Sequence, residues 1–269
     1  MNDAAGTMDP CPILLINLPG STGRLADAER QFADAGLHFE RIDAVDGRRM
    51  APAEIAAHCP DNSDSFYSPL TPGEVGCYLS HLAALRAIVA RGLPAAVVFE
   101  DDFRLLPGFV PCLRELLALG DGLPDLVKMY GARRRGEVLR RLGCGAALVR
   151  SSSPPICSTC TLWTQRGARK MLAASASLRR PVDVQLKHWW EEDLDILWLA
   201  PPAVTDSPEH TPASTIGSRK VVSALGRVRK MRYRWGYAVE RECRYAMRHG
   251  LAGWARSLMP LPRNARRTP

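Results

Sequence analysis

Three consecutive carboxylates, Glu100-Asp101-Asp102, follow the apolar run Ala95–Phe99. The run predicts a buried strand, and ligands of open α/β sheets bind beyond the carboxyl ends of the strands. Adjacent carboxylates repel one another, and a divalent cation would offset that repulsion because Mg²⁺ and Mn²⁺ prefer oxygen ligands. Such a cation could hold a diphosphate and stabilise it as a leaving group. The three residues therefore indicate a metal site, with a solvated acidic turn as the alternative.

A second acidic pattern, Asp193-Leu194-Asp195, comes before a short apolar run rather than after one. The run Ile196–Leu199 predicts a strand. The two aspartates then lie at the amino edge of the sheet, away from the edge where ligands bind. We interpret this pattern mainly as a solvated acidic loop.

The eight cysteines give a weaker signal. Cys157 and Cys160 form a C-x-x-C pair, and the other six cysteines are isolated in the sequence. A structural zinc site normally needs a second such pair or a nearby histidine pair, and the sequence has neither. We expect plain buried or surface thiols, and no zinc at Cys157 and Cys160.

The elements that would position the carboxylates alternate between strands and helices. Residues 12–18 and 39–45 predict strands, and residues 24–35 between them predict a helix. The order strand–helix–strand with a Gly-rich first turn is typical of a parallel sheet in an α/β protein. A longer helix begins at Thr71, because Thr71 and Glu74 form a capping box around Pro72.

The composition is that of a folded protein of 269 residues, 46% of them apolar. No uncharged apolar run approaches the roughly 18 residues that span a bilayer. Residues 1–10 carry two aspartates and no basic residue, unlike the start of a signal peptide. These features predict a cytoplasmic protein with reduced thiols.

Charge divides the chain into two parts. Residues 219–269 carry 14 basic and 2 acidic residues, a net charge of +12. Residues 1–218 carry 22 basic and 26 acidic residues, a net charge of −4. We therefore expect a domain over residues 11–218 and a basic, helical extension over residues 219–269. Bases interleaved with Trp and Tyr favour an anionic membrane surface as the partner. A nucleic-acid-binding protein is the alternative, although no RNA- or DNA-binding module is recognisable.

The run Gly73-Glu74-Val75-Gly76-Cys77-Tyr78-Leu79-Ser80-His81 resembles the "GE-x-GC-x-LSH" signature of glycosyltransferase family 25. The family includes bacterial lipooligosaccharide galactosyltransferases and animal collagen galactosyltransferases. Glu100–Asp102 follows in the expected order, and the resemblance covers residues 11–218. Weaker family elements complete it: Ile16-Asn17-Leu18 with Arg24, Ala44-Val45-Asp46-Gly47, Gly167-Ala168, Pro181-Val182-Asp183 and Ser214-Thr215-Ile216.

The resemblance implies a GT-A-like fold, with a Rossmann-like, mostly parallel sheet flanked by helices. It implies an inverting hexosyltransferase that moves a sugar, most often galactose, from a UDP-sugar to a lipid-linked oligosaccharide in lipopolysaccharide biosynthesis. The enzyme would lie peripherally on the inner face of the cytoplasmic membrane. An inactive, sugar-binding homologue is the alternative.

The resemblance also implies roles for individual residues. A divalent cation, Mn²⁺ or Mg²⁺, would bind at Glu100, Asp101 and Asp102. Asp183 would be the catalytic base that deprotonates the acceptor hydroxyl, with a helix N-cap as its structural alternative. Donor binding would fall to five residues: Asn17, Arg24, Asp46, Ser80 and His81.

Overall fold

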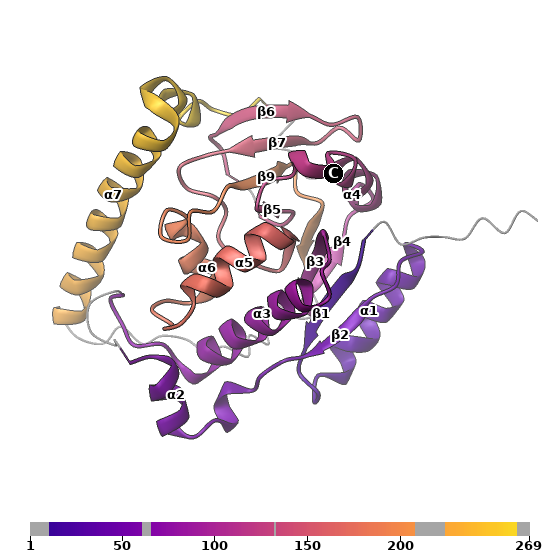
Figure 1. Ribbon diagram of the computed structural model, residues 1–269, viewed down its shortest axis with the longest axis horizontal. Coiled ribbons are helices and arrows are strands. Elements are labelled where there is room, and N and C mark those ends of the chain that lie inside the picture. The colour runs from indigo at the N-terminus through magenta and orange to yellow at the C-terminus, as the bar shows by residue number, and fades with distance from the viewer. Residues whose placement is uncertain (1–10, 61–65, 132, 208–223, 263–269) are drawn as a thin grey trace, which may run out of the picture.

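The computed structural model describes residues 11–60, 66–131, 133–207 and 224–262. An eight-stranded sheet has the strand order β2-β1-β3-β8-β5-β9-β7-β6, and β10 pairs with β4 beside it (Figure 1). The strands are β1 Ile13–Asn17, β2 Glu40–Asp43, β3 Ala95–Glu100, β4 Phe103–Leu105, β5 Leu126–Lys128, β6 Glu137–Arg141, β7 Ala147–Arg150, β8 Cys160–Thr164, β9 Ile196–Ala200 and β10 Val204–Asp206.

Most strands of the large sheet run in one direction. The pairs β1–β2, β1–β3 and β5–β9 are parallel, whereas β8 and β7 run antiparallel to their neighbours. The carboxyl ends of β1, β3 and β5 therefore meet at one edge, beside the amino end of β8. The predicted α/β fold with a mostly parallel sheet flanked by helices is confirmed.

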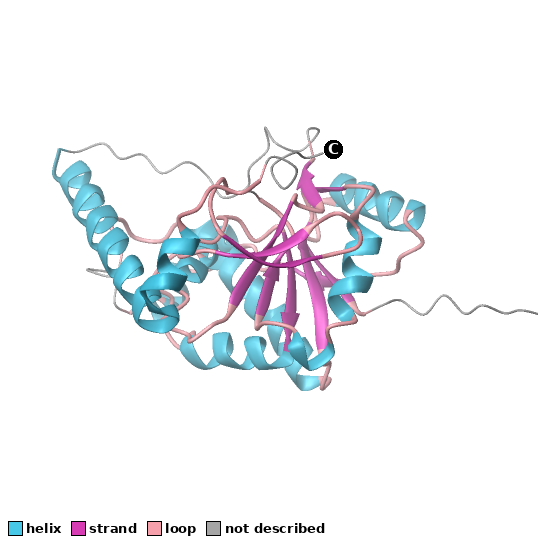
Figure 2. Ribbon diagram, turned by 90° about the horizontal axis from the view of Figure 1, so that it is seen from above, coloured by secondary structure: helices cyan, strands magenta, loops and turns pink. Residues whose placement is uncertain are grey.

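Helices cover both faces of the sheet (Figure 2). Residues of α1 and α4 pack into one core, and residues of α3, α5 and α6 pack into the other. The helices are α1 Thr22–Asp34, α2 Pro52–His58, α3 Pro72–Ala90, α4 Phe109–Leu117, α5 Gln165–Ala174, α6 Val182–Gln185 and α7 Ala224–Ser257, with 3-10 turns η1 Gly47–Arg49, η2 Gly120–Gly122 and η3 Leu186–His188.

Strand β3 shows how the two cores divide. Val97 and Phe99 face the core of α1 and α4, while Ala96 and Val98 face the core of α3 and α5. All four are buried, as the side-chain alternation of a strand covered on both faces requires. This burial fixes β3 and so fixes where Glu100 leaves the sheet.

The start of α3 is anchored as the sequence predicts. The Thr71 side chain accepts a hydrogen bond from the Glu74 amide, and the Glu74 carboxylate accepts one from the Thr71 amide. Two glycines then allow close backbone packing, because a Cβ on Gly47 would lie 1.7 Å from the Pro72 carbonyl oxygen and one on Gly76 would lie 2.4 Å from the Val45 carbonyl oxygen. The loop after β2 therefore rests directly on α3.

The sequence patterns do not predict three strands, β4, β6 and β10. Strand β6 precedes β7 as the first strand of a hairpin. Its sequence, Glu137-Val138-Leu139-Arg140-Arg141, is mostly polar because β6 is the edge strand and is largely exposed. β4 is only three residues long. The family element Ser214-Thr215-Ile216 lies outside the described residues.

Helix α7 packs along one side of the domain (Figure 1). Its Tyr245 is buried, and the Arg248 guanidinium donates a hydrogen bond to the Leu194 carbonyl oxygen (3.1 Å). Gly250, with φ 73°, interrupts the helix. No helix within the described ranges is long and apolar enough to cross a membrane. The boundary at residue 218 stays a prediction.

Candidate active site

The carboxyl edge of β1 and β3 opens into two adjoining hollows. The first lies between α1, the loop after β2 and α3, and its lining includes Arg24, Asp46, Ser80 and His81. The second lies beneath the segment around Phe66 and includes Asp183. Cys77, Glu100 and Asp102 line both hollows, so the carboxylates after β3 stand where the two meet.

Asp101 is held by two side chains from the other elements at this edge. The Asn17 amide nitrogen donates to one carboxylate oxygen (2.7 Å), and the Arg24 guanidinium donates to the other (2.8 Å). Both partners were predicted to bind the donor, and Asn17 lies just beside the first hollow. These contacts occupy both oxygens of Asp101, so the structure argues against it as a direct metal ligand and gives it the role of fixing Arg24.

Asp102, unlike Asp101, has a carboxylate oxygen without a hydrogen-bond partner. Its Oδ1 atom is buried and has no hydrogen-bond partner, although the Arg24 guanidinium lies 3.9 Å from Oδ2. Burial and the nearby Glu100 carboxylate raise the pKa of Asp102 to about 6. A buried, unpartnered carboxylate oxygen is costly unless a cation or a proton meets it. Asp102 therefore fits a divalent cation best among the three predicted ligands.

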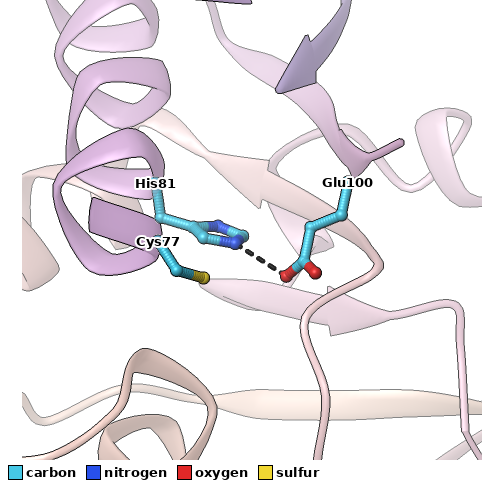
Figure 3. Close-up of side chains that lie close together, drawn as sticks. All are labelled: Cys77, His81 and Glu100. Carbon is cyan, nitrogen blue, oxygen red and sulfur yellow. Dashed lines mark hydrogen bonds and ion pairs between the residues drawn. The ribbon is translucent and has the colours of Figure 1, made fainter. Parts of the chain in front are cut away.

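Glu100 points back toward helix α3. One of its oxygens lies 2.9 Å from His81 Nε2, and the Cys77 sulfur completes a group whose ligand atoms lie within 4.8 Å of one another (Figure 3). Residues 77 and 81 share a face because they are four apart on the helix. Burial and the surrounding carboxylates raise the pKa of Cys77 well above its usual range. This group could also hold a cation of borderline softness, such as Zn²⁺.

Ser80 and Asp46 line the first hollow but are engaged with their own backbone surroundings. The Ser80 hydroxyl donates to the Gly76 carbonyl (2.7 Å) and accepts from the Val45 amide (2.8 Å). Asp46 caps η1, and the Arg48 guanidinium beside it lowers the pKa of the Asp46 carboxyl. The structure thus gives both residues a part in shaping the hollow. Their donor-binding roles stay predictions.

Asp183, the predicted base, lines the second hollow from the first turn of α6. Pro181 occupies the N-cap position of that helix, so Asp183 is not its N-cap residue. Its carboxylate accepts a hydrogen bond from the Val184 amide (2.8 Å). Burial raises the pKa of Asp183, and the Lys128 ammonium opposes that shift. An ionisable, half-buried carboxylate facing a hollow suits a general base.

Lys128 lies behind the wall of the second hollow and was not revealed by the sequence patterns. It ends β5, is fully buried, and donates to the Cys157 carbonyl oxygen (2.6 Å). Burial lowers the pKa of Lys128 to about 8, while the Asp183 charge opposes that shift. The available signal was a lysine inside the apolar run 126–130, where a charge needs a partner.

The C-x-x-C pair is split between two settings. Cys157 lines the second hollow and has φ 74°, whereas Cys160 is buried in β8. Burial raises the pKa of both thiols, to about 11 for Cys157. The absence of zinc at this pair stays a prediction.

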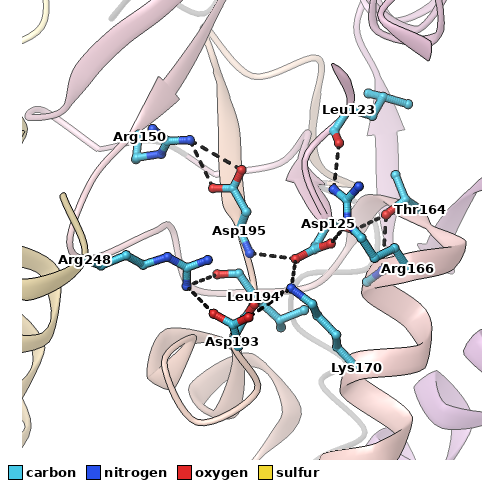
Figure 4. A network of polar contacts seen from close by, with 11 residues as sticks. Leu123, Asp125, Arg150, Thr164, Arg166, Lys170, Asp193, Leu194, Asp195 and Arg248 are labelled. Atoms are coloured by element: carbon cyan, nitrogen blue, oxygen red, sulfur yellow. Dashed lines mark hydrogen bonds and ion pairs between the residues drawn. The ribbon is translucent and has the colours of Figure 1, made fainter. Parts of the chain in front are cut away.

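The second acidic pattern serves the scaffold. Asp193 and Asp195 precede β9, at the amino edge that the sequence predicts. Asp195 pairs with Arg150 (3.2 Å), and its amide donates to Asp125 (3.0 Å). Lys170 of α5 pairs with both Asp125 (2.9 Å) and Asp193 (3.3 Å) (Figure 4). The paired charges of this network tie β5, β9 and α5 together, while the Asp193 side chain stays 76% exposed.

Helix α7 reaches the rim of the second hollow through aromatic rings. Tyr233 packs on Phe66 and Tyr67, with ring centroids 5.1 and 5.7 Å apart, and both of those residues line the hollow. Trp235, two residues further on, is 69% exposed. The interleaved aromatic residues of the basic extension therefore divide between packing on the domain and facing outward.

Comparison with known proteins matches the N-terminal part of the chain. Residues 11–121 match the model of glycosyltransferase family 25 (LPS biosynthesis protein). Over these residues the chain is similar to glycosyltransferase family 25. The match includes β1, α3 and the Glu100–Asp102 run, which are the elements that build the first hollow.

Three relatives show the range of names in the family. A Bos taurus protein named probable inactive glycosyltransferase 25 family member 3 is 32% identical over 189 residues, which cover 60% of this chain and 30% of the relative. Procollagen galactosyltransferase 1-A of Xenopus laevis is 32% identical over 132 residues, 47% of this chain and 22% of the relative. Inactive glycosyltransferase 25 family member 3 of Mus musculus is 41% identical over 110 residues, which cover 39% of this chain and 19% of the relative. The chain spans less than a third of the length of these relatives.

These relatives correct one prediction. Procollagen galactosyltransferases occur among the matches from Xenopus laevis, Danio rerio and Mus musculus. Their named acceptor, procollagen, is a secreted animal chain. The prediction of a cytoplasmic enzyme on the inner face of the cytoplasmic membrane is therefore wrong.

Proposed function

We propose that this glycosyltransferase moves galactose from UDP-galactose to an acceptor hydroxyl, with metal assistance and inversion at the anomeric carbon. The observation that carries the proposal is the junction of the two hollows at Glu100 and Asp102. The first hollow, with Arg24 at its wall, suits the anionic donor. The second, with Asp183, suits the acceptor.

The metal would lie at the junction. Asp102 would hold it through the buried Oδ1 atom that lacks a partner, together with an oxygen of Glu100. When bound, a divalent cation neutralises a diphosphate and stabilises it as a leaving group. Arg24, fixed by its 2.8 Å contact with Asp101, adds a permanent positive charge at the same edge.

Asp183 would take the acceptor proton. In a single displacement, the acceptor oxygen bonds to the anomeric carbon from the side opposite the diphosphate, and the bond from that carbon to the phosphate oxygen breaks. UDP leaves, and the hydroxyl proton moves to the Asp183 carboxylate. Burial strengthens Asp183 as a base because it raises the pKa toward neutral pH.

The charge of the second hollow favours a cationic acceptor. Five carboxylates line it, from Glu74, Glu100, Asp102, Asp183 and Asp206, and its described lining contains no lysine or arginine. A phosphorylated oligosaccharide would be repelled, whereas hydroxylysine offers both a hydroxyl and an ammonium group. The names of the procollagen galactosyltransferases support the same choice. We therefore favour a collagen-like acceptor over the lipooligosaccharide expected from the sequence.

The test measures UDP release and sugar transfer from a panel of UDP-sugars, each with Mn²⁺ and with EDTA. One arm offers a hydroxylysine-containing collagen peptide, and the other offers a lipooligosaccharide core. We expect transfer from UDP-galactose to the peptide with Mn²⁺, and its loss in Asp183→Asn. Transfer to the oligosaccharide alone would overturn the acceptor assignment. Full activity in EDTA would overturn the metal role.

An inactive homologue is the second candidate, because relatives from Bos taurus, Mus musculus and Rattus norvegicus carry inactive or probable inactive in their names. This chain has carboxylates where the proposed reaction would need them, at Asp102 and Asp183. The two candidates separate in one measurement. Saturable UDP binding without transfer to either acceptor would favour the inactive homologue.

A further inference from the structure

Two cysteines far apart in the sequence meet on the opposite side of the sheet from α3. Cys112 lies on α4, and Cys144 lies in the turn between β6 and β7. Their sulfur atoms are 2.7 Å apart. A disulfide bond is about 2.05 Å long, and two sulfurs at the observed separation lie well inside their van der Waals contact distance. The pair is thus nearly at bonding distance.

Contacts between Glu115 and the backbone of the β6–β7 turn bring the pair together. Glu115 follows Cys112 by one turn on the same face of α4. Its carboxylate accepts hydrogen bonds from the amides of Gly143 (2.6 Å) and Cys144 (2.5 Å). A Cβ on Gly143 would lie 3.2 Å from that carboxylate, so glycine fits the close approach. Glu115 therefore clamps the turn onto α4 with the two sulfurs facing each other.

The turn itself is closed on the other side. The Leu142 amide donates to the Ala146 carbonyl (2.8 Å), and the Gly145 amide donates to the Leu142 carbonyl (3.1 Å). Gly145 has φ 90°, a conformation that favours glycine. The backbone of Cys144 is thus fixed at the tip of a tight hairpin turn beside α4.

We propose that Cys112 and Cys144 form a disulfide bond that staples α4 to the β6–β7 hairpin. The proposal departs from the expectation of reduced thiols. In the exchange with oxidised glutathione, both S–H bonds break and the S–S bond of the protein forms. The two electrons and two protons pass to glutathione, which leaves as two reduced molecules. Cys144 reacts first because it is half-buried, whereas Cys112 is buried.

The staple lies away from the reaction centre. Neither Cys112 nor Cys144 lines either of the two hollows. Closing a loop of about 30 residues restricts the unfolded chain, so oxidation should raise the melting temperature by roughly 5–10 °C. Activity at temperatures where both forms are folded should not change.

The experiment counts free thiols in the full chain after equilibration in oxidised glutathione or in dithiothreitol. The samples are acid-quenched, denatured and alkylated, and intact mass reports the number of labels. The sequence holds eight cysteines, so we expect eight labels after reduction and two fewer after oxidation. Peptide mapping should find one cross-linked peptide that contains Cys112 and Cys144.

Two variants and a control complete the design. Cys112→Ser and Cys144→Ser should each lose both the cross-link and the gain in melting temperature. Cys243→Ser, at an exposed position on α7, should keep both. Eight labels in excess oxidised glutathione, or a cross-link that survives Cys144→Ser, would overturn the proposal.

Discussion

The Lys128 ammonium donates a 2.6 Å hydrogen bond to the carbonyl oxygen of Cys157. The lysine is fully buried, and the carbonyl belongs to a residue with a left-handed backbone, φ 74°. Cys157 is followed by Ser158 and Thr159, which line the hollow that contains Asp183. The buried Lys128 ammonium thus holds a wall of the hollow in place. Its positive charge also lowers the pKa of Asp183.

Replacing Lys128 with methionine should shift the pH dependence of the reaction. The Lys128 charge lowers the pKa of Asp183 against the effect of burial, so its removal raises that pKa further. A base must be deprotonated, and the acid limb of kcat should therefore move to higher pH by roughly one unit. The measurement is kcat from pH 5 to pH 9. Arg86→Met, which removes an exposed charge on α3, should leave the limb in place.

Asp101 and Asp102 should differ in their response to metal concentration. Asp102→Asn removes the carboxylate with the unpartnered oxygen, so turnover should fall by at least ~10²-fold and half-saturation should need more Mn²⁺. Asp101→Asn instead breaks the contacts with Arg24 and Asn17. It should lower turnover without changing the Mn²⁺ concentration for half-saturation. An equal increase in the Mn²⁺ concentration for half-saturation in both variants would show that Asp101 is also a metal ligand.

The sequence predicts the parts of the fold that follow from local patterns. β1 and β3 are continuous apolar runs because both faces are covered, and the Thr71 capping box marks the start of α3. β6 lacks such a pattern because its exposed edge position leaves it polar. Local patterns fail where burial depends on distant neighbours.

The candidate site follows the same division. The sequence places Glu100–Asp102 at a strand end, which the structure confirms. It does not reveal that Asn17 and Arg24 occupy Asp101 and leave Asp102 with an unpartnered oxygen, because those contacts join residues 77 or more positions apart. Lys128 is hidden for the same reason, since its partner at Cys157 lies 29 positions away.

Glu192 should make stability depend on pH. It is 7% exposed, and its Oε2 atom has no hydrogen-bond partner. Burial raises the pKa of Glu192 to about 7 from an ordinary 4.5. The folded state therefore binds this proton more tightly than the unfolded state, and the stabilisation present at low pH is lost as pH rises toward 7.

Glu192→Gln removes that titration. The unfolding free energy of the variant minus that of the parent should increase by roughly 3 kcal/mol between pH 4 and pH 8. Urea denaturation at several pH values measures the difference. Glu240→Gln, on an exposed part of α7, is the matched control. A difference for Glu192→Gln that stays constant with pH would contradict the assignment.

Removing α7 should unfold part of the domain instead of only releasing a tail. Tyr245 is buried in the core beneath α3 and α5, and Trp254 packs against the same core. A chain that ends at Ser218 exposes that apolar surface, so its melting temperature should fall by several degrees or more. Differential scanning calorimetry measures the change. A truncated chain with the parental melting temperature would show that α7 is dispensable for stability.

Contact with an anionic membrane is best tested on the outer face of intact α7. Val228, Met231, Trp235 and Val239 are 47–69% exposed and follow one another at three- and four-residue steps, so they form one apolar stripe. Arginines flank the stripe, and each basic residue near an anionic leaflet adds about 1 kcal/mol of attraction.

We expect binding to vesicles that contain phosphatidylserine, weakened by salt and by Trp235→Ser, with the fold intact by circular dichroism. Tyr67→Ser, at the rim of the second hollow, should leave vesicle binding unchanged. Equal binding of the parent and Trp235→Ser, or binding to neutral vesicles alone, would rule out this surface as the anionic contact.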